Sequence, residues 1–157
     1  ATLVNEIQTE DVAALTLQHE SGALSTLSAT LGSTPEVSRL RFSFNRLTAE
    51  SNHDPYEFPG DPWTYTGDTP EDEAALAGAL EGWEPGIEGW AGQFVRFADA
   101  LAEGGAPPVT LDDARHGLEI VTAAYRAART GVDVELPLGP DDPDRRGWAP
   151  RPEESEA

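Results

Sequence analysis

The sequence predicts an α+β domain with an open, mainly antiparallel sheet and two main helices packed on one face. Three observations indicate this class. Short segments of alternating apolar and polar residues fill the first third of the chain, a glycine-containing turn joins two of them, and two longer segments with helical periodicity follow. Strands followed by helices are typical of α+β domains, in which the other face of the sheet is left for a further partner.

Four strands are expected in the first third of the chain, at residues 1–7, 10–19, 23–31 and 38–49. In the last of them Leu40, Phe42 and Phe44 alternate with Arg39, Arg41 and Ser43, the pattern of a half-buried strand. A continuation through Leu47 after a turn at Asn45 is an alternative for its second half.

The loop between the second and third predicted strands determines their register. A two-residue loop would place Leu15 opposite Ser28, whereas a three-residue loop places Leu15 opposite Leu27 and also Ala13 opposite Ala29. A slip of one residue moves every side chain to the other face, so burial favours the register that pairs the apolar residues. We therefore predict the three-residue loop, with Gly22 in the left-handed conformation.

Residues 51–68 have no sustained period and are rich in proline, glycine, aspartate and aromatic residues, so we predict a long irregular loop. Loops of this length inside compact domains are commonly functional.

Helices are predicted from residue 69 to near Gly82, from 86 to 103, and from 111 to 130. The first has Thr69 as N-cap and proline at its first position, and the last lies between Thr110 as N-cap and Gly131. Alternation over residues 132–136 predicts a short strand before Pro137. The domain is therefore expected to span residues 1–137, followed by a Pro-rich charged tail over 138–157.

Composition excludes several classes of function. The net charge of -19 and the high share of Asp and Glu argue against a nucleic-acid partner or an anionic membrane as partner. There is no cysteine, no run of about 20 apolar residues, and no histidine spacing typical of zinc ligands, so we expect no metal site, no membrane span and a cytoplasmic location. The chain begins at Ala1 without methionine, which we take to indicate a piece of a longer polypeptide.

The segment 51–66, SNHDPYEFPGDPWTYT, carries the most distinctive chemistry. His53, Tyr56 and Trp63 offer hydrogen-bonding groups and flat apolar rings, a combination that suits the surface of a sugar or polyol. The alternative is a loop that its own aromatic side chains attach to the domain. Nucleotide-binding and nucleophile motifs are absent from the sequence: it contains no GxGxxG, no GxxxxGK[ST] and no GxSxG.

Three segments together resemble the C-terminal domain of the Gfo/Idh/MocA oxidoreductases, the family of glucose-fructose oxidoreductase and inositol dehydrogenase. They are TEDVAALTLQHESGALSTLSAT (9–30), GQFVRFADALAEGGAPPVTLDDARHGLEIVTAAYRAARTGVDVELP (92–137) and DDPDRRGW (141–148). The order of strand, glycine turn and strand, then a Gln-Phe helix, a further helix and a TGV-x-V-x-LP ending is specific to that family.

The resemblance implies a substrate-binding and assembly domain whose NAD(P) is bound by an N-terminal Rossmann domain absent here, with no cofactor expected for this chain alone. It also implies a sugar, cyclitol or related alcohol as substrate, and a homo-oligomer formed through the sheet face. His53, Tyr56 and Trp63 are the expected substrate-binding residues, with Gln93 as a further candidate. No catalytic residue can be assigned, because the family's catalytic lysine has no counterpart in a chain without lysine.

Two alternatives remain at this point. The chain could be a non-catalytic module that binds partners or associates with itself through its sheet. It could also be a relative that uses NAD in glycoside hydrolysis, and in either case the absence of lysine argues against catalysis by the chain alone.

Overall fold

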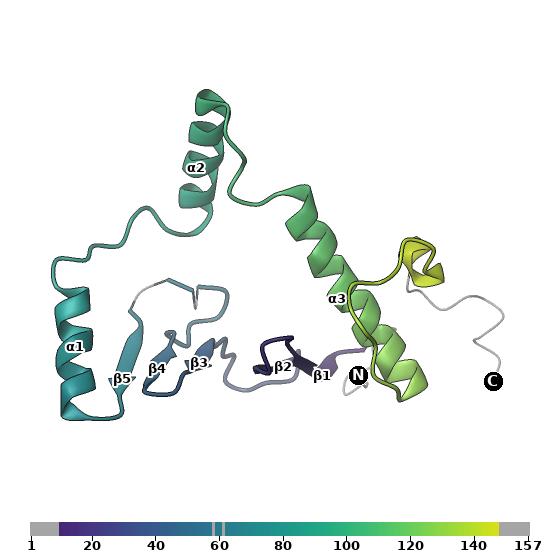
Figure 1. Cartoon of the computed structure of the whole chain (residues 1–157), viewed down its shortest axis with the longest axis horizontal. Helices are drawn as coiled ribbons and strands as arrows, with labels where there is room; N and C mark the ends of the chain where they lie inside the picture. Colours follow the sequence, from purple (N-terminus) through teal and green to yellow (C-terminus); the bar gives the residue numbers. More distant parts are fainter. Residues whose placement is uncertain (1–9, 58, 61, 148–157) are drawn as a thin grey trace. The chain divides into compact units, whose positions relative to one another are not determined.

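The computed structural model describes residues 10–57, 59–60 and 62–147. Its elements are labelled in Figure 1. The chain divides into two compact units, the first made of residues 1–32 and 109–157 and the second of residues 33–108. Within the described residues the strands form two antiparallel sheets, one of two strands and one of three, and three α-helices accompany them. The α+β class is confirmed, with the strands divided between two sheets where one open sheet was expected.

The two-stranded sheet of the first unit is the predicted hairpin. β1 (Val12–Gln18) pairs with β2 (Leu24–Thr30), and the register places Leu15 opposite Leu27 and Ala13 opposite Ala29. Gly22 has a φ of 87°, a backbone angle that residues other than glycine rarely adopt. The three-residue loop and its register are therefore confirmed, while the strand expected at residues 1–7 lies outside the described residues.

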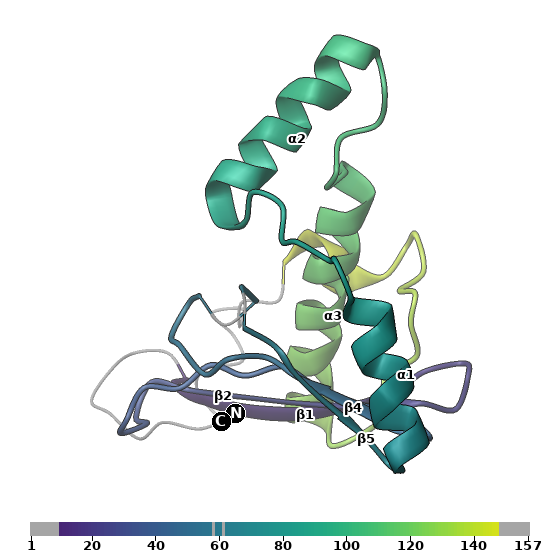
Figure 2. The same ribbon diagram turned by 90° about the vertical axis from the view of Figure 1, so that its left-hand side faces the viewer.

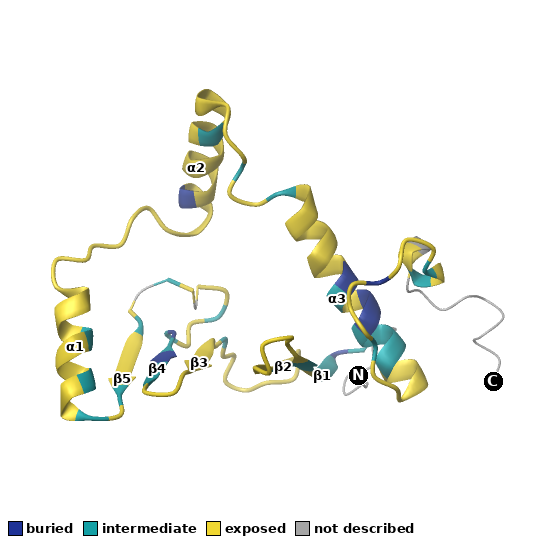
Figure 3. Cartoon of the chain, viewed as in Figure 1, coloured by how far each residue is buried: buried dark blue, intermediate teal, exposed yellow. Residues whose placement is uncertain are grey.

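The longest helix, α3 (Leu111–Thr130), begins and ends where its capping residues predict. The Thr110 side chain accepts a hydrogen bond from the Asp113 backbone N–H, and the Asp113 carboxylate bonds the Thr110 N–H in return at 2.8 Å. Gly131 ends the helix in the left-handed conformation. Its buried side chains are Glu119, Thr122 and Ala123. Its periodic apolar residues are mostly exposed, among them Leu111, Leu118 and Val121 (Figure 3).

The segment after α3 corrects one prediction. Residues 132–136 form no strand, because their backbone has no partner strand among the residues that the structure describes. The chain continues to the short 3₁₀ helix η1 (Pro143–Arg146), which lies against α3. On the way, Leu138 is buried and its backbone N–H donates to the Glu119 carboxylate at 2.8 Å.

The second unit contains a three-stranded antiparallel sheet in the order β3 (Arg41–Ser43), β4 (Leu47–Glu50) and β5 (Thr64–Gly67). The alternative for residues 38–49, a turn at Asn45 followed by continuation through Leu47, is confirmed: the segment forms two strands, joined by a tight turn at Asn45 and Arg46 in which the Phe44 N–H donates to the Leu47 carbonyl. The range predicted for the loop, 51–68, is too long. Its last part forms β5, because Trp63, Tyr65 and Gly67 alternate with threonines and the free edge of β4 forms backbone hydrogen bonds with this segment.

Helix α1 (Pro70–Leu80) follows β5 directly and lies beside it in Figures 1 and 2. Thr69 caps it as predicted. Two residues before the cap, position 67 requires a glycine, because a Cβ at Gly67 would collide with the backbone of Glu73. The helix ends at Leu80 with Glu81 as its C-cap, next to the Gly82 near which it was expected to stop. Ala75, Leu76 and Ala79 line a shallow hollow together with Leu47 of β4, so α1 covers that end of the apolar face of the sheet.

Helix α2 (Gly89–Glu103) ends at Gly104 in the left-handed conformation, as predicted. It begins three residues later than expected, and Gly92 explains the tight first turn, since a Cβ there would collide with the Ile87 carbonyl. The stripe of Trp90, Phe94, Phe97 and Leu101 is exposed along its length (Figure 3).

Candidate functional site

The predicted binding loop starts from a buried serine at the end of the three-stranded sheet. The Ser51 hydroxyl accepts a hydrogen bond from the Leu40 N–H at 2.9 Å, and the Ser51 N–H donates to the Leu40 carbonyl at the same distance. The pairing of β3 and β4 thereby continues past both strands as far as Ser38 and His53. The loop is attached to a rigid hairpin at its first residues.

Asn52 holds the first half of the loop in shape. Its side-chain amide donates to the carbonyls of Gly60 at 2.7 Å and Glu57 at 3.3 Å, while its side-chain oxygen accepts from the Asp54 N–H at 2.9 Å. A short polar side chain that bonds neighbouring backbone groups stabilises a turn that no helix or strand supports. Asn52 therefore supports the loop from within, in addition to the aromatic attachment that the alternative interpretation predicted and that Trp63 provides.

Trp63 is attached to the sheet, and Tyr56 is not. The Trp63 ring stacks on Phe42 of β3 with centroids 6.1 Å apart and an interplanar angle of 15°, and its indole N–H donates to the Pro59 carbonyl at 3.0 Å. Tyr56 is 88% exposed and has a φ of 64°. For a residue other than glycine this left-handed backbone conformation costs about 1 kcal/mol of folding free energy, and such residues are common in functional loops. Trp63 therefore forms a fixed apolar surface and Tyr56 an exposed ring on the same loop.

His53 is hydrogen bonded to a carboxylate that sequence reasoning had not considered. Its Nε2 lies 3.0 Å from Oε1 of Glu50, and Arg39 and Arg41 lie 3.8 and 3.5 Å from the two oxygens of the same carboxylate. The His53 hydrogen bond, then the charges of the two arginines, hold the pKa of Glu50 below its ordinary value, although partial burial opposes the shift. We call these four residues the Glu50 cluster.

The Glu50 cluster follows from the register of the hairpin. Arg41 lies directly opposite Glu50, and Arg39 is two residues away on the same face of β3. The sequence shows the alternation of these arginines with phenylalanines and offers a turn at Asn45, but it does not assign their partner, because Glu50 lies outside the predicted strand 38–49. Glu50 and Asn52 are the functional candidates that sequence reasoning missed.

Gln93, the fourth predicted substrate residue, lies on α2 with an exposed side chain. The three loop residues, in contrast, belong to one segment bounded by β4 and β5. The structure thus brings His53 and Trp63 to the three-stranded sheet, leaves Tyr56 exposed on the loop between them, and places Gln93 on a separate element.

No group of three or more His, Asp or Glu side chains within the described ranges is arranged to hold a metal ion. None of the helices in the described part of the chain is long and apolar enough to cross a membrane.

Comparison with known families identifies the domain. The profile of an oxidoreductase family, the C-terminal alpha/beta domain of Gfo/Idh/MocA proteins, matches residues 1–136. The chain belongs to this family. Searches among curated proteins and among solved structures gave no match. The matched residues of this Gfo/Idh/MocA domain include both sheets, all three α-helices, the loop with His53, Tyr56 and Trp63, and the Glu50 cluster.

Proposed function

We propose that this chain is the substrate-binding and assembly domain of an NAD(P)-dependent oxidoreductase acting on a sugar, cyclitol or related alcohol. Membership of the oxidoreductase family supports the reaction class. The observation that carries the substrate assignment is the Trp63 ring, fixed on Phe42, on the same loop as the exposed Tyr56. Fixed aromatic faces next to hydrogen-bonding groups suit ligands that alternate C–H faces with hydroxyl groups.

The junction of β5 and α1 does not suit the pyrophosphate of NAD(P). A dinucleotide pyrophosphate is bound at a glycine-rich turn between a strand and the N-terminus of a helix. Here β5 leads into α1, but Glu71, Asp72 and Glu73 occupy its first turn, and the Asp72 and Glu73 carboxylates already bind backbone N–H groups of Thr69 and Gly67. Three carboxylates at that position repel phosphate, so in our proposal the cofactor is bound by a separate N-terminal dinucleotide-binding domain.

The substrate proposal is tested by calorimetry of the chain with myo-inositol and glucose, followed by the variants Tyr56→Ala and Trp63→Ala. We expect weak, saturable binding of at least one polyol, weakened about tenfold in either variant, because ring stacking contributes about 1 kcal/mol or more per contact. Trp83→Ala is the matched control, since Trp83 is an exposed tryptophan outside the loop. Absence of polyol binding, or equal losses in Trp83→Ala, would contradict the proposal.

The same titration with NAD(H) and NADP(H) separates the two halves of the proposal. We expect no micromolar binding of either nucleotide to this chain. Micromolar binding would mean that a cofactor site exists among these residues, and the assignment of the cofactor to a separate domain would be wrong.

Self-association through the sheet is a second candidate role, favoured by the exposed apolar side chains along β3. Leu40, Phe42 and Phe44 all point to one face, and Phe44 is 63% exposed. Apolar groups on an accessible sheet face are typical of protein interfaces. Light scattering after size exclusion tests this role, with Phe44→Ser expected to shift the chain towards the monomer.

A further inference from the structure

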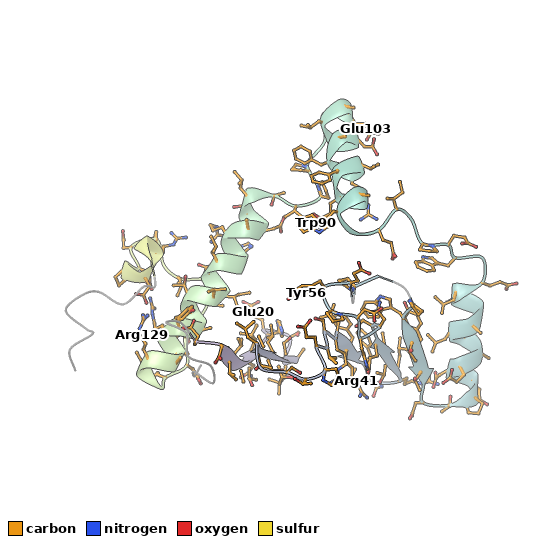
Figure 4. All side chains as sticks on the ribbon, turned by 180° about the vertical axis from the view of Figure 1, so that it is seen from behind. Glu20, Arg41, Tyr56, Trp90, Glu103 and Arg129 are labelled. Atoms are coloured by element: carbon orange, nitrogen blue, oxygen red, sulfur yellow. The ribbon has the colours of Figure 1, made fainter. Side chains whose placement is uncertain are left out.

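The Glu50 cluster lies on the polar face of the three-stranded sheet. Successive residues of a strand point to opposite faces, so Arg39, Arg41 and Glu50 share one face while Phe42 shares the other with Ala49 and Tyr65. Figure 4 shows the labelled Arg41 at the lower edge of the strands and Tyr56 above them. The cluster is thus distinct from the Trp63 surface proposed above for the sugar or polyol.

The two arginines of the cluster are only loosely paired. Their guanidinium nitrogens lie 3.8 and 3.5 Å from Glu50, whereas Arg46 approaches Asp72 to 2.7 Å and Arg126 approaches Asp144 to 2.7 Å in the same chain. Charge-assisted hydrogen bonds between guanidinium and carboxylate are about 2.7–2.9 Å long. Among the described residues, Glu50 is also the one carboxylate within 4 Å of either group. Most of the donors of Arg39 and Arg41 therefore face solvent.

The cluster has an excess of positive charge on a strongly acidic chain. Two arginines accompany a single glutamate, while the whole chain has a net charge of -19. The side chains of Arg39 and Arg41 remain 54% and 56% exposed. Thr64, directly opposite Glu50 in the register, adds an exposed hydroxyl to the same face. Guanidinium pairs beside a hydroxyl match the oxygens of a carboxylate or a phosphate.

We propose that Arg39 and Arg41 form a binding site for a small anionic ligand that presents a carboxylate or phosphate group to the polar face of the sheet. Glu50 acts as a positioning residue. Each of its oxygens faces one guanidinium, and the His53 hydrogen bond fixes the carboxylate in turn. The remaining guanidinium N–H groups bind the anion. The inference stands on the hairpin and its charges. His53 is shared with the predicted sugar or polyol site, whereas Arg39 and Arg41 are not part of that site.

The test is a titration of the full 157-residue chain by NMR or calorimetry, at constant ionic strength set by sodium chloride. The probes are inorganic phosphate for the phosphate source and gluconate for the carboxylate source, with glucitol as the uncharged counterpart of gluconate. We expect saturable binding of phosphate, gluconate or both, and no binding of glucitol at this face. Which anion binds more tightly distinguishes the two sources.

Substitutions locate the site. Arg39→Gln and Arg41→Gln should each weaken anion binding about five- to tenfold, since each removes hydrogen bonds to a charged group. Arg41→Lys should give an intermediate loss, because lysine keeps the charge but not the planar fork. Arg96→Gln is the control, an equal change of charge at an exposed arginine of α2. Tyr56→Ala should leave the affinity for the anion unchanged, although it is expected to weaken polyol binding.

Three results would overturn the proposal. They are the absence of saturable binding by both anions, an equal loss in Arg96→Gln, and no loss in either glutamine variant at Arg39 or Arg41. Because both side chains are more than half exposed, the variants are expected to fold, and their unfolding midpoints are measured alongside to show it.

Discussion

Two arginine clusters in this chain use the same residue types for different purposes. In the first unit, Arg126 of α3 contacts Asp142 and Asp144, and η1 lies against the helix. In the second unit, Glu50 is shared by Arg39, Arg41 and His53. Arg129 also reaches Asp144 at 3.5 Å, so two cations balance two anions in the first cluster, whereas two arginines share one glutamate in the second. The balance of charges and the 2.7 Å contact of Arg126 distinguish this structural contact from the proposed anion site.

The Arg126 contacts belong to a larger attachment, in which residues 138–147 lie on α3. Glu119, buried on the helix, accepts the Leu138 N–H and pairs with Arg115 at 3.3 Å. Both aspartates bring their charge to one guanidinium, which raises the pKa of Arg126 and, on the partner side, lowers the pKa of Asp142. We call this arrangement the α3 attachment.

The largest expected effect is on the apolar part of the α3 attachment. Leu138→Ala should lower the free energy of unfolding of the first unit by about 2 kcal/mol, because it removes a buried side chain from a small core. Thermal unfolding followed by circular dichroism measures it, with Leu136→Ala as the control at a more exposed position of the same segment. Equal losses in both variants would mean that the segment does not pack as described.

Arg126→Ala should come next. It leaves Asp142 without its guanidinium and Asp144 with only the longer contact to Arg129, so residues 138–147 should become more sensitive to limited proteolysis and the unfolding midpoint should fall by about 3–5 °C. Arg96→Gln serves as the control for loss of an arginine. A wild-type pattern of cleavage in Arg126→Ala would show that the apolar contact of Leu138 alone holds the segment.

The pH dependence should separate the paired aspartate from the rest of the acidic surface. Because Arg126 lowers the pKa of Asp142, this group stabilises the folded state above its ordinary pKa of about 4, and the contribution is lost as the pH falls through the depressed value. NMR titration of the Asp142 carboxyl should show this low pKa in the wild type and a return towards the ordinary value in Arg126→Ala. A pKa that is unchanged by the substitution would remove the ion pair from the explanation.

The smallest effect is expected at the Glu50 cluster. Arg41→Gln should change the unfolding midpoint by no more than about 1 °C, because exposed and loosely paired ions contribute little to stability. The measurement is made in parallel with Arg126→Ala. A loss as large as that of Arg126→Ala would mean that the Glu50 cluster is a structural contact after all, and the contrast between the two clusters would fail.

Local rules predicted most of the elements. Thr69 and Thr110 mark helix starts, Gly104 and Gly131 mark helix ends, and the apolar pairing of Leu15 with Leu27 selects the register of the first hairpin. Each of these features depends on residues a few positions apart in the sequence or on a single turn. They can therefore be read without knowledge of the rest of the fold.

Features that depend on a distant partner were predicted poorly. Residues 132–136 alternate like a strand, yet alternation becomes a strand only where another edge accepts the backbone hydrogen bonds. β5 lies inside the predicted loop. Its sequence is too short to indicate a strand by itself, and it becomes one because β4 pairs with its backbone. The same holds for the Glu50 cluster, which exists because a turn at Asn45 brings Glu50 opposite Arg41.

The sequence alone therefore determined the family, the class of fold, the helix ends and the loop that carries His53, Tyr56 and Trp63. The tertiary structure decided which of these residues are fixed and which are exposed: Trp63 stacks on Phe42, His53 binds Glu50, and Tyr56 stays free of the sheet. The physical reason is range. Capping, turns and periodicity act within a few residues, whereas ring stacking and ion pairing depend on which strands meet, and only the folded chain brings those strands together.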